Sequence, residues 1–230
     1  MAARLTSFLS ASVFLLAGCA TPPQLPVPLA ANTFASPANK IGVSMSVMPK
    51  VDTHFPGAGC LLCLAAASMM HSALTTHTQT LPTADLSRLK EEVATMLRKK
   101  STDVMIITEA IDGAKLTASK VQGTNVARND FTFMKAKYGI DKLLLIDINY
   151  LGVSRNFASY IPTEEPKAIV SGSSALINLR DNTYEWFQPL SAIKSADSKW
   201  DEPPKFPGLT NAYFQAVEMT RDSVTQPLAK

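Results

Sequence analysis

The first nineteen residues combine features that decide where the rest of the chain can fold. Arg4 supplies a positive charge, residues 5–17 form an apolar run without charge, and small residues then precede Cys19. A positive start, an apolar core and a small-residue cleavage site are typical of a secretory signal. Because the run is shorter than the about 20 apolar residues that a permanent membrane helix needs, the pattern predicts a removable signal over residues 1–18.

Residues 16–19 read Leu-Ala-Gly-Cys, and at the end of an apolar run this sequence resembles the lipobox of bacterial lipoproteins. The resemblance implies that the Cys19 thiol carries diacylglycerol, that cleavage occurs before Cys19, and that the new amino group carries a fatty acid such as palmitate. At about 0.8 kcal/mol per buried methylene group, two or three acyl chains anchor a protein stably. An ordinary secretory signal with an incidental cysteine is the alternative.

The residue after the expected anchor indicates the membrane to which the chain is sent. Ala20, rather than an aspartate, follows Cys19, and in Gram-negative lipoproteins this resembles the signal for export to the outer membrane. We therefore expect a lipid-anchored protein on the periplasmic face of the outer membrane. The small net charge of +3 does not indicate nucleic-acid binding.

Prolines are concentrated in the stretch that follows Cys19. They are Pro22, Pro23, Pro26, Pro28 and Pro37. Because prolines at this density favour the extended polyproline II conformation, we predict that residues 19–39 form a tether that holds a domain away from the membrane. Residues 40–230 are expected to form that domain, since 46% apolar and 18% charged residues are typical of a globular core.

Hydrophobic periodicity predicts elements in the order β-α-α-β-α-β-β-β-α. Strands are predicted over residues 41–47, 104–107 and 143–155, followed by a hairpin whose strands flank residues 181–182, Asp-Asn. Helices are predicted over residues 60–74, 83–97, 129–139 and 209–224. Helices between the early strands indicate parallel crossovers, whereas the late strands form an antiparallel meander. The expected fold is therefore α/β, with a single mixed β-sheet packed with helices.

This order resembles the small α/β domain of curli-secretion lipoproteins, of lipoprotein activators of peptidoglycan synthases, and of the TolB N-terminal domain. A strand at residues 40–47 opens the domain after the lipobox and tether, and residues 139–142, Gly-Ile-Asp-Lys, lead a helix into the strand at 143–148. The resemblance implies a role in envelope assembly, in regulating wall synthesis or in an oligomeric secretion assembly. Pore-forming members of these families insert hairpins of strongly alternating strands into the membrane. The sequence shows no such pair of segments flanked by aromatic residues, so a pore is not expected.

Cys60 and Cys63 are the cysteines that remain once Cys19 is lipidated. In an exported protein, a C-x-x-C pair can be a disulfide, two buried thiols, a redox centre or half of a metal site. One helical turn brings residues i and i+3 to about 5–6 Å, which a disulfide allows. The Gly-rich entry permits a redox pair at a helix N-terminus, but Leu61 and Leu62 favour a packed, apolar setting. A disulfide is the preferred interpretation, and the other three stay open.

A zinc site would need His71 and His77 in addition to the cysteines, because thiolate and imidazole ligands form tetrahedral zinc sites. The Cys–His spacing is shorter than in common zinc modules, and the two histidines fall on different faces of one helix. We therefore expect no metal and no cofactor. His54 has no partner that the sequence makes visible.

The sequence contains none of the nucleophile, zinc-protease, phosphate-loop or dinucleotide motifs that mark common enzymes. Carboxylate pairs at residues 164–165 and 201–202 lie in Pro-containing segments, which favours solvated surface over acid–base chemistry. Tyr184, Trp186 and Phe187 share one predicted strand, and alternation places Trp186 opposite Phe187. One face of this strand is expected to be core, and the other is either core or a partner surface.

Taken together, these features predict a non-enzymatic lipoprotein that binds another envelope protein. Two alternatives stay open. One is a thiol-redox or metal-binding protein that uses Cys60 and Cys63, and the other is a subunit of an oligomeric secretion assembly.

Overall fold

The computed structural model describes residues 23–34, 39–100 and 103–229, and a six-stranded mixed sheet organises them. The strands are β1 (Ile41–Met45), β2 (Asp52–His54), β3 (Val104–Ile106), β4 (Lys142–Ser154), β7 (Lys167–Asn178) and β8 (Thr183–Ser195). Their order is β3-β1-β4-β7-β8, and β2 pairs with the far end of β4. Pairing is parallel among β1, β2, β3 and β4 and antiparallel among β4, β7 and β8. The predicted α/β fold with a mixed sheet is confirmed.

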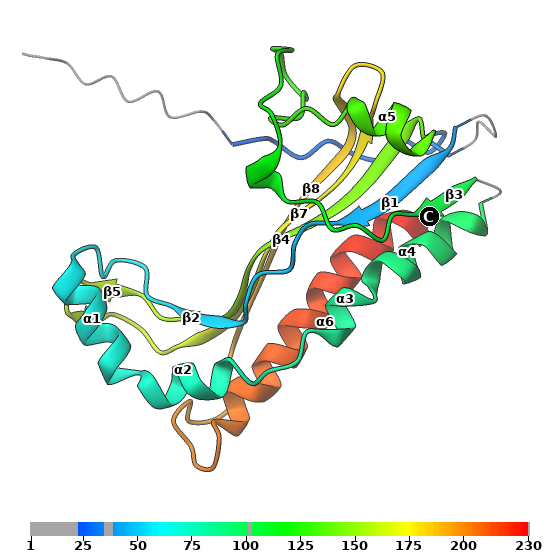
Figure 1. Cartoon of the computed structure of the whole chain (residues 1–230). Coiled ribbons are helices and arrows are strands. Elements are labelled where there is room, and N and C mark those ends of the chain that lie inside the picture. The colour runs from blue at the N-terminus through cyan, green and yellow to red at the C-terminus, as the bar shows by residue number, and fades with distance from the viewer. Residues whose placement is uncertain (1–22, 35–38, 101–102, 230) are drawn as a thin grey trace, which may run out of the picture.

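The apolar run at the start of β4 has partners on both faces of the sheet. Leu144 and Ile146 belong to the larger apolar cluster, which α4 (Leu89–Arg98) and α6 (Pro207–Ala229) share. Leu143 belongs to a second cluster on the other face, with Met134 of α5 (Phe133–Tyr138). Figure 1 shows α4 and α6 together on one face and α5 on the opposite one. A strand that is covered on both faces needs no polar alternation, which explains the uninterrupted run.

Two predicted helices are divided, and three short strands were not predicted. The helix predicted over residues 60–74 is α1 (Leu61–Met70) followed by α2 (Ser72–Thr78), and the helix predicted over 83–97 is α3 (Ala84–Ser87) followed by α4. Besides β2, a hairpin of β5 (Phe157–Ala158) and β6 (Ile161–Pro162) lies in a segment predicted to be loop. A single turn of 3₁₀-helix at Gly113–Lys115 completes the elements.

The long strands extend past the main sheet and support a distal lobe, which we define as α1, α2, β2 and the β5–β6 hairpin (Figure 1). At the base of this lobe, Asp52 of β2 pairs with Gly152 of β4. Gly152 has a φ of +136°, and a Cβ atom there would lie 2.0 Å from the Asp52 carbonyl oxygen. Only glycine permits both this backbone conformation and this close approach. The position of β2, and of the chain that leads into α1, therefore depends on Gly152.

Residues 23–34, which we call the strap, lie against the free edge of β8. The Val27 amide donates to the Phe187 carbonyl at 2.9 Å, and the Phe187 amide donates to the Val27 carbonyl at 3.0 Å. Leu29 and Phe34 pack against the larger apolar cluster. The prediction of a tether standing away from the domain is therefore wrong for the strap. Extended Pro-rich chain can pair with a sheet edge where its free amides allow, and Val27 supplies one.

The predicted signal over residues 1–18 and the predicted lipid-bearing Cys19 lie outside the described residues. Within the described ranges, none of the helices combines the length and the apolar character that a membrane crossing requires.

Candidate functional site

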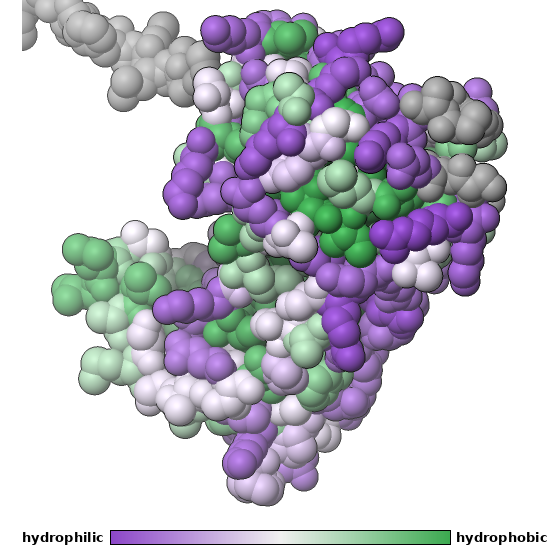
Figure 2. Space-filling model, turned by 45° about the vertical axis from the view of Figure 1, so that its right-hand side comes forward, coloured by the Kyte–Doolittle hydropathy of each residue, from purple (hydrophilic) through white to green (hydrophobic). Residues whose placement is uncertain are grey.

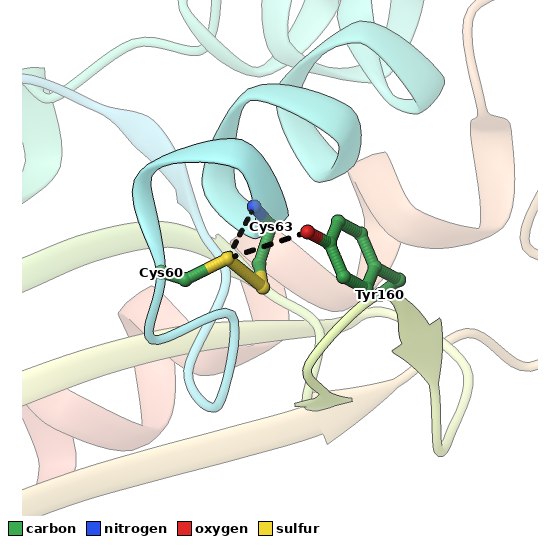
Figure 3. The surroundings of a disulfide bond; sticks show 3 residues. All are labelled: Cys60, Cys63 and Tyr160. Carbon is green, nitrogen blue, oxygen red and sulfur yellow. Dashed lines mark hydrogen bonds between the residues drawn. A yellow bond between two sulfur atoms is a disulfide. The ribbon is translucent and has the colours of Figure 1, made fainter.

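The two cysteines of the C-x-x-C pair meet at the start of α1. The structure joins Cys60 and Cys63 in a disulfide, with 4.9 Å between their Cα atoms (Figure 3). Cys60 is the N-cap of α1, and its Sγ accepts a hydrogen bond from the Cys63 amide at 2.9 Å. The Tyr160 hydroxyl, from the β5–β6 hairpin, lies 3.6 Å from the same sulfur. The pair therefore closes the first turn of α1 and links it to the hairpin.

The disulfide argues against two interpretations of the C-x-x-C pair, namely two buried thiols and half of a metal site. Two sulfurs that share a disulfide are not free thiols and do not supply thiolates to a metal. Cys60 is exposed whereas Cys63 is only 3% exposed. Among the described residues, no group of three or more His, Cys, Asp and Glu side chains could hold a metal ion.

His71 and His77, the further zinc ligands that the sequence suggested, have separate protein partners. His71 lies at the junction of α1 and α2, where its Nδ1 contacts the Ala67 carbonyl at 3.0 Å and its Nε2 contacts the Arg155 guanidinium at 2.6 Å. His77 Nε2 lies 2.8 Å from the Thr210 hydroxyl of α6. Burial lowers the pKa of His71 below its usual value, which favours the neutral ring that accepts a hydrogen bond from Arg155.

Arg155 connects the α1–α2 junction of the distal lobe with the segment after β6 and with the loop before α6. Besides His71, its Nε donates to the Glu164 carbonyl at 2.8 Å, and its guanidinium lies 5.0 Å from the centre of the Trp200 ring. Trp200 in turn stacks with Phe206. No pattern in the sequence indicates this cluster, because its members come from three separate parts of the chain, near residue 71, at residues 155–164 and at residues 200–206. The cluster holds the α1–α2 junction against the loop that precedes α6.

Large apolar side chains are exposed at the free end of the distal lobe. We define this apolar cap as Leu61, Leu62, Leu64, Met69 and Met70 of α1 with Ile161 of β6. Leu61 is 89% exposed, Met69 78% and Ile161 68%. Figure 2 shows hydrophobic side chains gathered at this end of the molecule. The cap is exposed because α1 packs inward through the small residues Cys63 and Ala67.

A cavity of about 900 Å³ opens beside the cap, and we call it the α2 groove. One wall is a face of α1 and α2, and the other is β2 with parts of β4 and β7. Its lining consists of Asp52, Thr53, His54, Phe55, Pro56, Leu64, Ser68, Ser72, Thr75, Thr76, Gln79, Tyr150, Ser154 and Ile169. The sequence did not identify this groove, since its residues come from four separate parts of the chain.

His54 carries the least satisfied polar group of the groove. Its Nε2 is buried and has no hydrogen-bond partner among the described residues. The ring stands edge-on to Tyr150, with 4.8 Å between ring centres. Burial lowers the pKa of His54, which favours the neutral ring.

The other residues singled out in the sequence have structural partners. Glu164 pairs with Lys167 and accepts a hydrogen bond from Asn156, while Glu202 accepts one from Ser198. Trp186 is 2% exposed in the larger apolar cluster, whereas Phe187 packs against the second cluster and pairs with the strap. Both faces of this strand are therefore covered by the chain itself.

Replacing both Cys60 and Cys63 with serine is expected to lower the free energy of unfolding by about 2 kcal/mol, because the disulfide closes a short loop in the unfolded chain. Urea denaturation of the double variant measures the difference. The wild-type chain unfolded in dithiothreitol should give the same lower value. Equal stability with and without the reductant would contradict this role of the disulfide.

Neither a protein-family model nor a curated protein matches the chain. Two solved structures align with most of it. Protein XCC0632 from Xanthomonas campestris, described with the family model DUF330, is 15% identical with a TM-score of 0.40, and the alignment covers 90% of this chain and 92% of that one. A dodecamer of a PelC variant from Paraburkholderia phytofirmans is 12% identical with a TM-score of 0.31, covering 84% and 90%. At these values, neither likeness establishes a family or a function for the chain.

Proposed function

We propose that the chain is a lipid-anchored protein on the periplasmic face of the bacterial outer membrane, and that it acts without catalysis by binding another envelope protein. Cys19 carries the anchor, and a segment of the partner lies in the α2 groove. The observation that carries the proposal is the groove itself, an open cavity of about 900 Å³ between β2 and the α1–α2 face.

The length of the groove suits an extended peptide segment. Its lining residues on α1 and α2 run from Leu64 to Gln79. At 1.5 Å of rise per residue, the two helices, which meet at His71, span at most about 20 Å here, and an extended chain covers this with about six residues or fewer. A site open along this length accommodates a segment of a partner protein better than a compact small molecule.

The lining also indicates the chemistry of that segment. Asp52 is the charged residue of the lining, and its Oδ1 already accepts hydrogen bonds from the Thr53 amide at 2.8 Å and from Gln79 at 3.1 Å. The unpartnered His54 Nε2 and the half-exposed Tyr150 ring remain for the ligand. An uncharged segment that combines apolar side chains with one hydrogen-bonding group near His54 fits these features.

A photocrosslinking residue placed at Tyr150 of the full chain in intact cells is expected to form one major adduct with an envelope protein. Introducing Ser68→Arg, which sends a long cationic side chain into the groove, should reduce this adduct at least about tenfold by blocking the site. The same crosslinker at Phe133, exposed on α5, is the matched control.

An adduct that survives Ser68→Arg, or that forms equally from position 133, would contradict binding in the groove. Turnover of a substrate by the purified chain, including thiol exchange at Cys60 and Cys63, would contradict a purely binding role.

A further inference from the structure

We propose that the apolar cap is a membrane-contact surface, which places the exposed apolar side chains of α1 and the tip of the β5–β6 hairpin in the interfacial region of a lipid bilayer. The cap thereby gives the domain a second attachment besides the acyl chains on Cys19. Of the proposed function, this inference depends only on the lipid anchor at Cys19. It does not depend on the α2 groove, because the cap and the groove are separate surfaces that share only Leu64.

The exposed side chains lie along the whole of α1 and continue onto the hairpin. Leu61 and Leu62 lie in the first turn of the helix, and Met69 and Met70 lie in its last turn. Ile161 and the half-exposed Tyr160 extend the surface from the hairpin. A contiguous exposed patch of this kind marks a contact with a protein or a membrane rather than with water.

The absence of charge around the cap favours a bilayer over a protein. Residues 53–84 contain no Asp, Glu, Lys or Arg, and residues 156–163, which form the hairpin, contain none either. Protein interfaces are surrounded by a polar rim that includes charged residues. The cation next to this region, Arg155, is engaged with His71, with the Glu164 carbonyl and with the Trp200 ring. An uncharged end of the molecule enters lipid without the cost of desolvating ions.

Several backbone amides near the cap already have partners, which favours entry into a lipid environment. Cys60 Sγ accepts the hydrogen bond of the Cys63 amide, one of the free amides at the start of α1. At the hairpin, the Phe157 amide donates to the Pro56 carbonyl at 2.7 Å, and the Thr163 amide donates to the Asn156 carbonyl at 2.9 Å. The disulfide keeps the first turn of α1 closed at the place where it would enter the interface.

Tyr160 lies at the border between the cap and the rest of the lobe. Its hydroxyl contacts Cys60 Sγ (Figure 3), while its ring is half exposed. Tyrosine is enriched where proteins meet the headgroup level of a membrane, because its ring is apolar and its tip is polar. This position is consistent with a cap that inserts to the level of α1 and no deeper.

Because of the predicted anchor, the cap needs only a weak affinity for the bilayer in order to insert. The strap begins at Pro23, four residues after Cys19, and an extended chain of that length spans at most about 14 Å. Acyl chains on Cys19 therefore keep the domain beside the membrane surface, where even weak insertion is favoured by the high effective concentration. Because the cap lacks basic residues, its insertion does not depend on anionic lipids.

The test uses the full lipidated chain reconstituted into phosphatidylcholine vesicles that contain brominated lipid. Tryptophan is introduced by Leu61→Trp or Met69→Trp in the cap and by Phe133→Trp on α5 as the control, and wild-type emission from Trp186 and Trp200 is subtracted. Emission from both cap variants is expected to shift to the blue and to be quenched about twofold or more, whereas the control is not quenched. Adding phosphatidylglycerol should not change the result.

Cap variants that stay unquenched while the protein sediments with the vesicles would overturn the inference and leave the anchor intact. Quenching that requires phosphatidylglycerol would also overturn it. A blue shift that appears without lipid and grows with protein concentration would assign the cap to a second copy of the chain. If most of the protein fails to sediment with the vesicles, but the fraction that does sediment is still quenched, the result would count against the anchor and support the cap.

Discussion

Replacing Cys19 with alanine is expected to abolish palmitate labelling of the chain and to leave residues 1–18 attached. The expected effect is large, because two acyl chains contribute more than about 10 kcal/mol of membrane binding at about 0.8 kcal/mol per buried methylene group. Cleavage is lost together with labelling, since in proteins with a lipobox the signal is removed only after the cysteine is alkylated. Metabolic labelling with palmitate and the mass of the N-terminal peptide measure the two effects.

Two further variants separate lipidation from sorting and from general damage. Ala20→Asp should keep the label but move the protein to the inner-membrane fraction, because the residue after the cysteine carries the sorting signal in the lipoproteins that the chain resembles. The double variant Cys60→Ser/Cys63→Ser should keep the label as well. Palmitate that remains on the Cys19→Ala chain would show that the Leu-Ala-Gly-Cys sequence is not a lipobox.

The elements that the sequence predicted well have strong local signals. The hairpin of β7 and β8 was predicted from residues 181–182, and the structure contains it, but with a longer loop over residues 179–182 in which Asn182 has a positive φ of 62°. The buried Asn182 side chain also binds the Phe131 amide and the Ala127 carbonyl, which fixes the turn against the second cluster. Likewise, the apolar run of β4 is unbroken because both faces of the strand are covered.

The distal lobe could not be predicted because its short strands depend on long-range pairing. β2 has three residues and forms only against the far end of β4, at the close approach that Gly152 permits. No window around residues 52–54 shows a strand pattern by itself. The α2 groove could not be predicted for the same reason. Thr53 becomes a neighbour of Thr75, and His54 a neighbour of Tyr150, only after β2 has paired with β4.

The strap was missed for a related reason. Proline density in residues 20–39 indicates extended chain, which fits the described residues 23–30, but it does not indicate what the extended chain contacts. Val27, between Pro26 and Pro28, retains the amide that pairs with Phe187. The strap therefore pairs with the backbone of Phe187 at the edge of β8, while the Phe187 side chain packs against the second cluster.

Replacing Trp186 with alanine is expected to lower the free energy of unfolding by about 3–5 kcal/mol and to release the strap. Trp186 is among the largest fully buried side chains, and its removal leaves a cavity in the larger apolar cluster. Leu29 and Phe34 of the strap pack against that cluster, so they lose part of their support. Urea denaturation measures the stability, and hydrogen exchange at the Val27 and Phe187 amides measures the strap.

Trp200→Ala is the matched control, because Trp200 packs with Phe206 and Arg155 beside the distal lobe, away from the strap. It should lower stability less and leave exchange at Val27 unchanged. If the Val27 amide stays protected in the Trp186→Ala chain, the strap is held by its hydrogen bonds to Phe187 rather than by the apolar cluster. If both variants increase hydrogen exchange at the Val27 amide equally, the strap is released by the lower global stability and not by the loss of the Trp186 side chain itself.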